Sequence, residues 1–465
     1  MSDYLIAEIP YSPDSSVLFD KFADEPWSVF LDSNQPEAIH GRYDIISSRP
    51  KVYITSKNNK NNIDSWSDSL SVPGDPISIL KEYLQVNKSK NQGLKLPFMG
   101  GAIGYFSYDL GRSLEKLPTI AEDDLSLPDM KVGIYSWAII VDHNKKKSVL
   151  FGDKKELRMQ RDWNDLLSYV VDKTPLKKRQ GFKVLSDITS NMSEETYAQA
   201  FAKIKSYIRE GDCYQVNLAQ RFNALIQGDP WQAYCMLRTI NPSPFSAYLN
   251  YKDFQILSNS PERFLSVKDN VVQTKPIKGT RPRSKNNHED NALLQELINS
   301  KKDQAENVMI VDLLRNDISK NCALGSVKVP KLFDIESYPN VHHMVSTITG
   351  KLRENRSALD LLRGSFPGGS ITGAPKLRSM EIIEELEPHR RGIYCGGIGY
   401  ISSDGNMDTN IAIRTILHKD QKMYFYAGGG IVYDSEVSAE YQETFDKAAA
   451  MMQVLDQGKQ YARGN

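Results

Sequence analysis

Short runs of hydrophobic residues with a single polar position predict β-strands in the first part of the chain. Residues 27–31 and 43–46 are strand-like in this way, with aromatic and β-branched side chains. Residues 138–142 and 148–152 flank a polar tip, as the two arms of a β-hairpin do. We therefore predict a β-rich N-terminal region over residues 1–175.

Two polar stretches interrupt this pattern. Residues 57–71 are rich in Asn, Ser and Asp, which favours a solvated loop. Residues 172–181 contain Pro175 and a basic run at 177–179, which favours a linker on the surface. This linker separates the β-rich region from a second domain that we predict over residues 190–460.

Helical periodicity becomes prominent after the linker. Ser193 is a good N-cap and Gly211 a good terminator, so the residues between them predict a helix. Further helices are predicted over residues 288–299 and 302–317, and a last helix begins near Glu436. Helices and β-meanders grouped in blocks are typical of an α+β protein rather than of one with alternating strands and helices.

The candidate chemistry centres on Lys278. The dipeptide at 269–270 predicts a tight turn that folds the preceding strand back against the following one. Counting outward from the turn places Glu262 opposite Ile277, one residue from Lys278. Most lysines are solvated, but Lys278 stands between Ile277 and Gly279 and is not part of a charge run. A carboxylate and an amine at the open end of one hairpin suit covalent and acid–base catalysis.

Glutamates on two predicted helices form a second group. Glu306 shares a helix face with hydrophobic residues, where it either reaches water at the margin or binds a cation. Glu436, Glu440 and Glu443 share a face of the last helix. Such a row is usually solvated, and like charges four residues apart weaken a helix slightly. A divalent cation would remove this cost, and carboxylates with water are what Mg²⁺ prefers.

Two glycine-rich stretches suggest anion binding. Residues 366–376 join two helices, but Ala374 follows Gly373 where a phosphate-binding loop has Lys, so we exclude a nucleotide site. Such a turn can still bind a carboxylate through its backbone N–H groups. Residues 428–430 are three glycines that close a strand, and they either leave N–H groups open to an anion or form a flexible bend.

A second hairpin is predicted around Asp404-Gly405, which is a strong two-residue turn. Counting from this turn pairs Cys395 with Arg414. The same count brings Tyr394 close to Arg414, at the far end of the hairpin.

Composition and charge limit the possible functions. The 465 residues carry 58 basic and 58 acidic side chains, and this balance argues against nucleic acid or an acidic membrane surface as the main partner. Residues 132–141, the most hydrophobic run, are too short to span a bilayer, and the N-terminus lacks a signal-peptide pattern. Four cysteines without close spacing imply neither a zinc site nor a disulfide framework, so we expect a reduced, cytoplasmic protein.

The stretch 276–283, Pro-Ile-Lys-Gly-Thr-Arg-Pro-Arg, closely resembles the signature of the chorismate-utilising enzymes. It resembles the aminodeoxychorismate synthase branch in particular, in which a lysine stands at the place of Lys278, whereas the anthranilate synthase branch usually has alanine there. Residues 190–455 resemble the chorismate-binding domain throughout. Other matching stretches are 260–264, 312–317, 366–376, 428–430 and 439–444, with 100–101 and 108–112 in the first part of the chain.

This resemblance implies a fold like that of anthranilate synthase component I, with two packed antiparallel β-sheets surrounded by helices and the site between the sheets. It also implies that chorismate is the substrate, and that Glu306, Glu440 and Glu443 bind Mg²⁺. His343 matches a histidine placed for proton transfer. The positions that match the family's substrate-binding residues are Gly279, Thr280, Tyr394, Arg414, Gly428, Gly430 and Lys447.

The resemblance further implies a covalent route. The neutral amine of Lys278 would attack the chorismate ring while Glu262 protonates the leaving hydroxyl, and ammonia would then expel the lysine to give 4-amino-4-deoxychorismate, a reaction of the transaminase class in 4-aminobenzoate and folate biosynthesis. A free lysine has a pKa of about 10.4, so we expect a water-poor pocket beside Mg²⁺ and Arg414 to lower the pKa of Lys278.

The resemblance also implies a partner subunit and a second ligand. The chain has no cysteine on a tight glycine turn with a histidine base, so ammonia is expected from a separate glutamine amidotransferase subunit. The family's tryptophan pocket is matched by Leu31, Ser33, His40, Gly41, Arg42, Tyr43, Pro244, Phe245 and Ser246.

The alternative activity is that of anthranilate synthase component I, which Lys278 argues against. A non-catalytic relative that only binds L-tryptophan is the other rival, and the complete set of acidic and basic site residues argues against it.

Overall fold

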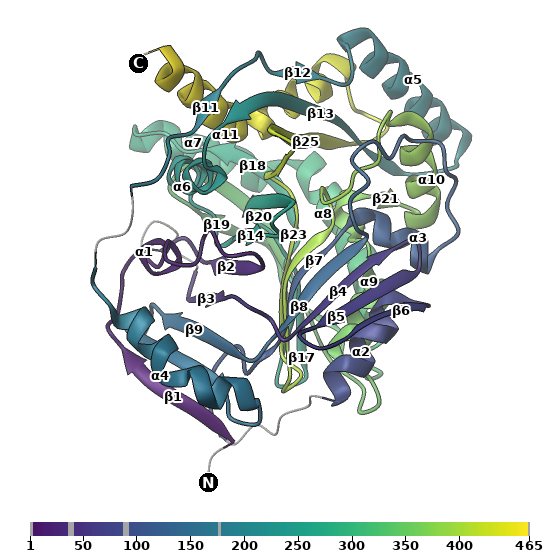
Figure 1. The fold of residues 1–465 in the computed structure, drawn as a ribbon. Helices are drawn as coiled ribbons and strands as arrows, with labels where there is room; N and C mark the ends of the chain where they lie inside the picture. Colours follow the sequence, from purple (N-terminus) through teal and green to yellow (C-terminus); the bar gives the residue numbers. More distant parts are fainter. Residues whose placement is uncertain (1–2, 36–40, 87–92, 175–177, 464–465) are drawn as a thin grey trace.

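Two large antiparallel β-sheets packed against each other form the centre of the molecule. The computed structural model describes residues 3–35, 41–86, 93–174 and 178–463, and Figure 1 shows helices around the two sheets. Among the described residues, the strand pairs of both sheets are antiparallel. The expected α+β fold is confirmed.

The first sheet has 13 of the described strands. Its order is β1 (Tyr4–Ile9), β10 (Lys147–Asp153), β9 (Trp137–Asp142), β3 (Tyr43–Ser47), β2 (Ser28–Asp32), β14 (Phe245–Asn250), β15 (Phe254–Ser260), β24 (Thr415–Lys419), β25 (Lys422–Ile431), β13 (Gln215–Gln227) and β11 (Lys183–Val184), while β12 (Thr189–Ser190) and β21 (Gly373–Ala374) also pair with β13.

The second sheet has 12 of the described strands. Its order is β18 (Ile277–Pro282), β20 (Val341–Lys351), β17 (Val271–Thr274), β16 (Arg263–Lys268), β23 (Met407–Ile411), β22 (Gly397–Ser402), β7 (Gly101–Phe106), β8 (Met130–Tyr135), β4 (Val52–Lys57), β5 (Lys60–Ser65) and β6 (Ser69–Pro73), and β19 (Lys328–Ser337) also pairs with β20. Each sheet therefore combines strands from residues 1–175 with strands from residues 190–460.

Helices cover the outer face of each sheet. Apolar clusters join the first sheet to α1 (Ser16–Phe19), α4 (Leu157–Val171), α6 (Pro230–Ile240) and α11 (Val437–Arg463), and join the second to α2 (Pro76–Val86), α8 (Lys301–Ser319), α9 (Ala358–Ser365) and α10 (Lys376–Leu386). Helix α5 (Glu194–Glu210) packs on β13 and α10. The remaining helical segments are η1 (Tyr108–Leu110), α3 (Gly111–Leu114), α7 (Asn287–Asn299) and η2 (Gly369–Ile371).

A third apolar cluster fills the space between the two sheets, and strand β7 shows how the sequence specifies it. Ile103 and Tyr105 belong to this inner cluster, whereas Ala102 and Phe106 belong to the cluster under the helices of the second sheet. Successive side chains of a strand point to opposite faces, so a continuous hydrophobic strand serves two cores. Such a strand is buried on both faces.

The predicted solvated loop at residues 57–71 is wrong. These residues contribute to β4, β5 and β6, the last of which is the edge strand of the second sheet. Asn58 and Asn59 both have positive φ, as a tight hairpin turn requires. The side chains of β6 are mostly exposed, so its composition resembles that of a loop although its backbone is paired.

The predicted register of the hairpin around Asp404 is also wrong by one residue. The strands β22 and β23 pair Ile401 with Met407 and Gly397 with Ile411. Five residues, 402–406, therefore lie between the last paired residues, whereas a two-residue turn was assumed. Cys395 instead contacts Ala412, whose carbonyl accepts a hydrogen bond from the Cys395 N–H at 2.9 Å.

The other predicted helices are confirmed to within a few residues. Ser193 caps α5 by accepting a hydrogen bond from the Thr196 N–H, and Gly211 ends it with a φ of 84°.

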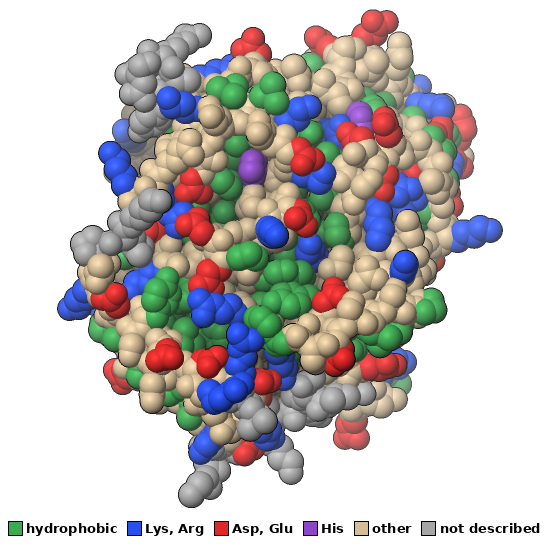
Figure 2. All heavy atoms as spheres, in the orientation of Figure 1, with side chains coloured by type: hydrophobic (Ala, Val, Ile, Leu, Met, Phe, Trp, Pro, Cys, Tyr) green, Lys and Arg blue, Asp and Glu red, His purple; other side chains and the backbone are tan. Residues whose placement is uncertain are grey.

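The surface of the molecule is charged without a dominant sign, and Figure 2 shows basic and acidic side chains interspersed over one face. This agrees with the zero net charge of the sequence.

Candidate active site

Lys278 lies in β18 with its side chain buried between two elements. Its Nζ donates to Oε1 of Glu306 on α8 at 3.0 Å and to the carbonyl of Ser370 in η2 at 3.1 Å. The preceding hairpin has the predicted register, since Ser266 pairs with Gln273. Gly279 has a φ of 87°, within a bulge of β18 that glycine can adopt without strain.

The expected lowering of the Lys278 pKa is not found. Burial opposes the charged form of Lys278, but the carboxylates of Glu306 and Glu262 outweigh burial and hold its pKa above the ordinary value. The protein by itself therefore keeps Lys278 as an ammonium group. Glu262 was expected beside this amine, but the direct contact with Glu306 was not.

Glu262 is the buried acid of the site. Burial raises the pKa of its carboxyl group, and the nearby Lys278 and a hydrogen bond from Ser370 offset only part of this effect. Ser370 donates from its hydroxyl to Oε1 of Glu262 at 3.0 Å. The backbone N–H of Ile277 also stabilises the carboxylate, so Glu262 lies beside the residue next to Lys278. A carboxyl group with a raised pKa is suited to donate a proton.

His343 lies on β20 opposite Thr280. Its Nδ1 and the hydroxyl of Thr280 are 2.8 Å apart. Burial lowers the pKa of His343 to about 3, and the positive charge of Arg414 contributes. The imidazole is therefore neutral near pH 7, and in this state it exchanges hydrogen bonds without acting as a cationic acid.

The three glutamates predicted to bind a metal border the strand β25. Glu306 accepts from Nε2 of Gln215 at 3.2 Å, and Glu443 forms an ion pair with Lys447 at 2.5 Å. Glu440 accepts from Ser435 through Oε1. Its Oε2 is buried and has no hydrogen-bond partner among the described residues.

These oxygen donors suit Mg²⁺ in their chemistry, and the unpaired oxygen of Glu440 is a specific sign of a missing positive partner. A Cβ atom added to Gly429 would lie 2.9 Å from Oε2 of Glu440, so glycine keeps this space open. Within the described part of the chain, however, no three acidic, histidine or cysteine side chains are close enough together to hold a metal. Glu306 instead forms an ion pair with Lys278, and Glu443 forms one with Lys447.

The other predicted substrate residues occupy the same region. Arg414 has a positive φ of 50° between β23 and β24 and acts electrostatically on Glu262 and His343. Lys447 donates to the carbonyl of Gly428 at 3.0 Å. Tyr394 is buried and stacks on Tyr426, with 5.3 Å between the ring centroids.

The three glycines at 428–430 lie at the end of β25. They pair with β13, from Asn217 opposite Gly430 to Ala219 opposite Gly428. In the described structure, β24 pairs with β25 only as far as Phe425, so the second edge of β25 is unpaired at the glycines. This arrangement agrees with a backbone that is open to a ligand, and the flexible bend is not found.

The glycine-rich turn at 366–376 presents carbonyl oxygens to its neighbours. The Ser370 carbonyl accepts from Lys278, the Ile371 carbonyl from Arg391 at 3.0 Å, and the Thr372 carbonyl from the N–H of Asn217 at 2.9 Å. We expected backbone N–H groups to face a carboxylate here. The turn instead holds two cationic side chains.

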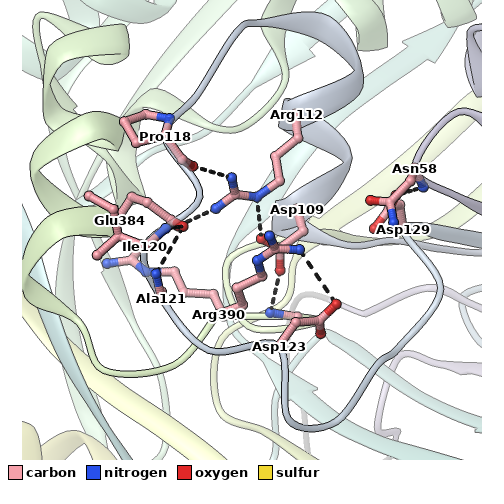
Figure 3. A network of polar contacts seen from close by, with 12 residues as sticks. Asn58, Asp109, Arg112, Pro118, Ile120, Ala121, Asp123, Asp129, Glu384 and Arg390 are labelled. Carbon is pink, nitrogen blue, oxygen red and sulfur yellow. Dashed lines mark hydrogen bonds and ion pairs between the residues drawn. The ribbon is translucent and has the colours of Figure 1, made fainter.

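Arg391, which was not predicted, holds this turn in place through its hydrogen bond to the Ile371 carbonyl. It is buried together with Glu387, and the two side chains form an ion pair of 2.6 Å. Figure 3 shows how the adjoining segment is tied to the first part of the chain: Arg390 donates to Asp123 at 3.4 Å, and Glu384 accepts from the N–H of Ile120 at 2.9 Å. In the sequence, Arg391 looks like one of two ordinary surface arginines.

The predicted tryptophan residues line one cavity of about 150 Å³. Eight of the nine are found there, and His40 lies outside the described residues. Arg263, Tyr400, Asp408 and Asn410 are among the further lining residues and were not predicted. Arg263 directly follows Glu262 in the chain, so the cavity and the buried carboxyl group of Glu262 lie at the same end of one strand.

A lysine beside a buried carboxyl group, with Glu306 linking it to the glycines of β25, is an arrangement that suits acid–base catalysis in an enzyme. The sequence profile of the chorismate binding enzymes matches residues 29–453. The chain therefore belongs to the family of chorismate binding enzymes.

Individual relatives agree with this assignment. Aminodeoxychorismate synthase component 1 of Escherichia coli (strain K12) is 46% identical over 94% of this chain and 95% of the relative. Anthranilate synthase component 1 of Acetivibrio thermocellus is 37% identical over 98% and 94%. The crystal structure of anthranilate synthase component I from Streptococcus pneumoniae TIGR4 matches with a TM-score of 0.79 and 35% identity, over 89% of this chain and 93% of that one.

The comparison of structures confirms the expected anthranilate synthase component I-like fold. A separate feature concerns membranes: among the helices of the described residues, none is long and apolar enough to cross a bilayer.

Proposed function

We propose that this chain is an aminodeoxychorismate synthase component 1, which converts chorismate and ammonia to 4-amino-4-deoxychorismate. The observation that carries the proposal is Lys278, a buried amine that shares Ser370 with the buried acid Glu262. The 46% identity to the Escherichia coli relative supports the same branch of the family.

The proposed reaction has two substitutions. The amine of Lys278 forms a bond to ring carbon C2, the two ring double bonds shift, and the C4–O bond breaks as Glu262 gives its proton to the departing oxygen, which leaves as water. Ammonia then bonds to C4, the ring electrons return, and the bond between C2 and Lys278 breaks. The nitrogen of the product loses one proton, which returns to the protein, so the sum is chorismate plus ammonia giving product plus water.

We propose that Glu306, Glu440 and Glu443 hold Mg²⁺ in this reaction. When bound, the ion would supply positive charge for the ring carboxylate of chorismate and offset the carboxylates that raise the pKa of Lys278. Arg414, Tyr394 and Thr280 are proposed to line the substrate pocket, together with Gly279, Gly428, Gly430 and Lys447. His343, being neutral, is proposed to exchange a hydrogen bond with the substrate.

The ammonia is proposed to come from a separate glutamine amidotransferase subunit in the cytoplasm. All four cysteines of the chain are free thiols. Burial raises the pKa of every one of them, to about 11 for Cys322 and about 12 for Cys235 and Cys395. A glutaminase needs an activated thiolate, and these thiols have the opposite environment.

Product analysis tests the proposed function. The protein is incubated with chorismate, Mg²⁺ and ammonium, and the products are separated and identified by mass. We expect 4-amino-4-deoxychorismate, which retains the pyruvyl group. Fluorescent anthranilate as the main product would overturn the proposal in favour of the other activity of this family.

Tryptophan binding is a second proposal, and the cavity of about 150 Å³ favours it. We expect L-tryptophan to raise the thermal midpoint of the protein, because a ligand that binds only the folded state stabilises it. Ala247 lines the cavity and is buried, so a larger side chain there should block the cavity. We expect Ala247→Met to abolish the rise of the thermal midpoint with L-tryptophan while chorismate turnover remains. An equal shift in the variant, or none in the wild type, would contradict tryptophan binding at this cavity.

A further inference from the structure

Ser370 contacts the amine and the acid of the proposed site at the same time. Its backbone carbonyl accepts from Nζ of Lys278 at 3.1 Å, and its hydroxyl donates to Oε1 of Glu262 at 3.0 Å. The residue itself is buried, with 7% of its surface exposed. One residue therefore contacts two groups that reach it from β18 and from the connection just before β16.

The turn that carries Ser370 is held rigidly from several sides. Arg391 binds the next carbonyl, that of Ile371, at 3.0 Å. Lys376 forms a buried ion pair of 2.6 Å with Asp317 on α8 and so anchors the far end of the turn. Gly369 lies against Leu313, where a Cβ atom would come within 2.5 Å of a side-chain carbon. A turn fixed at these points places the Ser370 hydroxyl precisely enough to orient a partner.

We propose that Ser370 is a positioning residue that joins the catalytic pair: its carbonyl orients the amine of Lys278, and its hydroxyl occupies Oε1 of Glu262 so that the proton to be donated resides on Oε2. This inference rests on the proposed function for the meaning of the two groups. It assigns to the glycine-rich turn a role that the sequence pattern of glycines does not indicate.

The hydrogen bond from Ser370 has a definite effect on Glu262. A donor to a carboxylate stabilises the charged form, so Ser370 holds the pKa of Glu262 below the value that burial alone would give. The other groups that act on Glu262 are Lys278 on β18, Lys447 on α11, Arg414 after β23 and Cys395 before β22. All of these remain in place when only the hydroxyl of Ser370 is removed.

The test compares kcat/KM for chorismate over a pH range, with ammonium as the nitrogen source. Ser370→Ala should lower the maximum about tenfold and move the alkaline limb about one unit to higher pH, because the raised pKa keeps Glu262 protonated for longer. Ser370→Thr keeps the hydroxyl and the carbonyl, so its limb should coincide with that of the wild type. A loss of rate by the same factor at every pH in Ser370→Ala would overturn the proposal.

Ser365→Ala is the matched control. Ser365 is also buried and stands five residues before Ser370, but its hydroxyl has no hydrogen-bond partner among the described residues. The substitution removes the same atom from the last residue of α9, just before the turn, and it should change neither the maximum nor the alkaline limb. A limb shift as large as that of Ser370→Ala would show that any cavity in this segment has the effect.

A second measurement separates this inference from the proposed function. The carboxyl band of Glu262 is followed by infrared titration, as the difference between the wild type and Glu262→Gln, and again in the Ser370→Ala background. We expect the band to titrate about one pH unit higher without the hydroxyl, whatever the product of the enzyme. If the wild type forms anthranilate but the band shifts, the proposed function fails and the role of Ser370 stands. An unshifted band overturns the role of Ser370.

Discussion

Lys278→Ala should lower the rate of 4-amino-4-deoxychorismate formation by roughly a thousandfold or more, because the variant has no amine to form the bond to the ring. Lys278 is the lysine that contacts both Glu306 and Ser370, at 3.0 and 3.1 Å. The rate is measured with chorismate, Mg²⁺ and saturating ammonium, so that no partner subunit is needed.

The matched control is Lys275→Ala. Lys275 lies three residues earlier and pairs with Glu336, outside the proposed site, so its loss should leave the rate nearly unchanged. A mass spectrum of the intact protein with chorismate and Mg²⁺, but without ammonia, should show an adduct in the wild type and none in Lys278→Ala. A Lys278→Ala enzyme that still forms the product at the wild-type rate would refute the covalent route.

Withdrawal of divalent metal should abolish activity, with a loss of roughly a hundredfold or more that added Mg²⁺ reverses. Glu440→Gln should raise the Mg²⁺ concentration needed for half-maximal activity about 10- to 100-fold, because the unpaired Oε2 is then part of a neutral amide. Activity is measured while Mg²⁺ is titrated into chelator-treated protein.

Glu436→Gln provides the control for the metal experiment. Glu436 lies four residues before Glu440 and is exposed. Its replacement by a neutral residue should therefore not change the Mg²⁺ concentration needed for half-maximal activity. Full activity in the presence of excess chelator would exclude a metal role for these glutamates. Equal effects of the Glu436 and Glu440 substitutions would also exclude this metal role, because they would show a general effect of negative charge.

Local patterns in the sequence were sufficient for the hairpin that carries Lys278. Asp269 and Asn270 both have positive φ, as a two-residue turn demands, and the register counted from them holds as far as Ser266 and Gln273. The same count failed at Asp404 because five residues, 402–406, lie between the last paired residues there. The length of a turn is set by contacts that dipeptide chemistry alone does not reveal.

The electrostatics of the site could not be predicted in the same way. Burial of Lys278 was foreseeable, but the sign of its pKa shift depends on the 3.0 Å distance to Glu306 on a helix far along the chain. Ser370 and Arg391 were missed for a similar reason: their contacts come from a turn and a loop whose neighbours are defined only by the assembled sheets. Residues that match a family motif were found, and residues that support them were not.

The position of β24 and β25 within the first sheet has a consequence for the order of events during synthesis. These two strands lie between β15 and β13, yet they are made only after residue 414. Until they emerge from the ribosome, β15 and β13 each present an unpaired edge, and α11 with Glu440 and Glu443 does not yet exist. A nascent chain that already contains Glu262 and Lys278 is therefore expected to be prone to self-association, and the proposed site is complete only after β24 and β25 have inserted between β15 and β13 and α11 has formed.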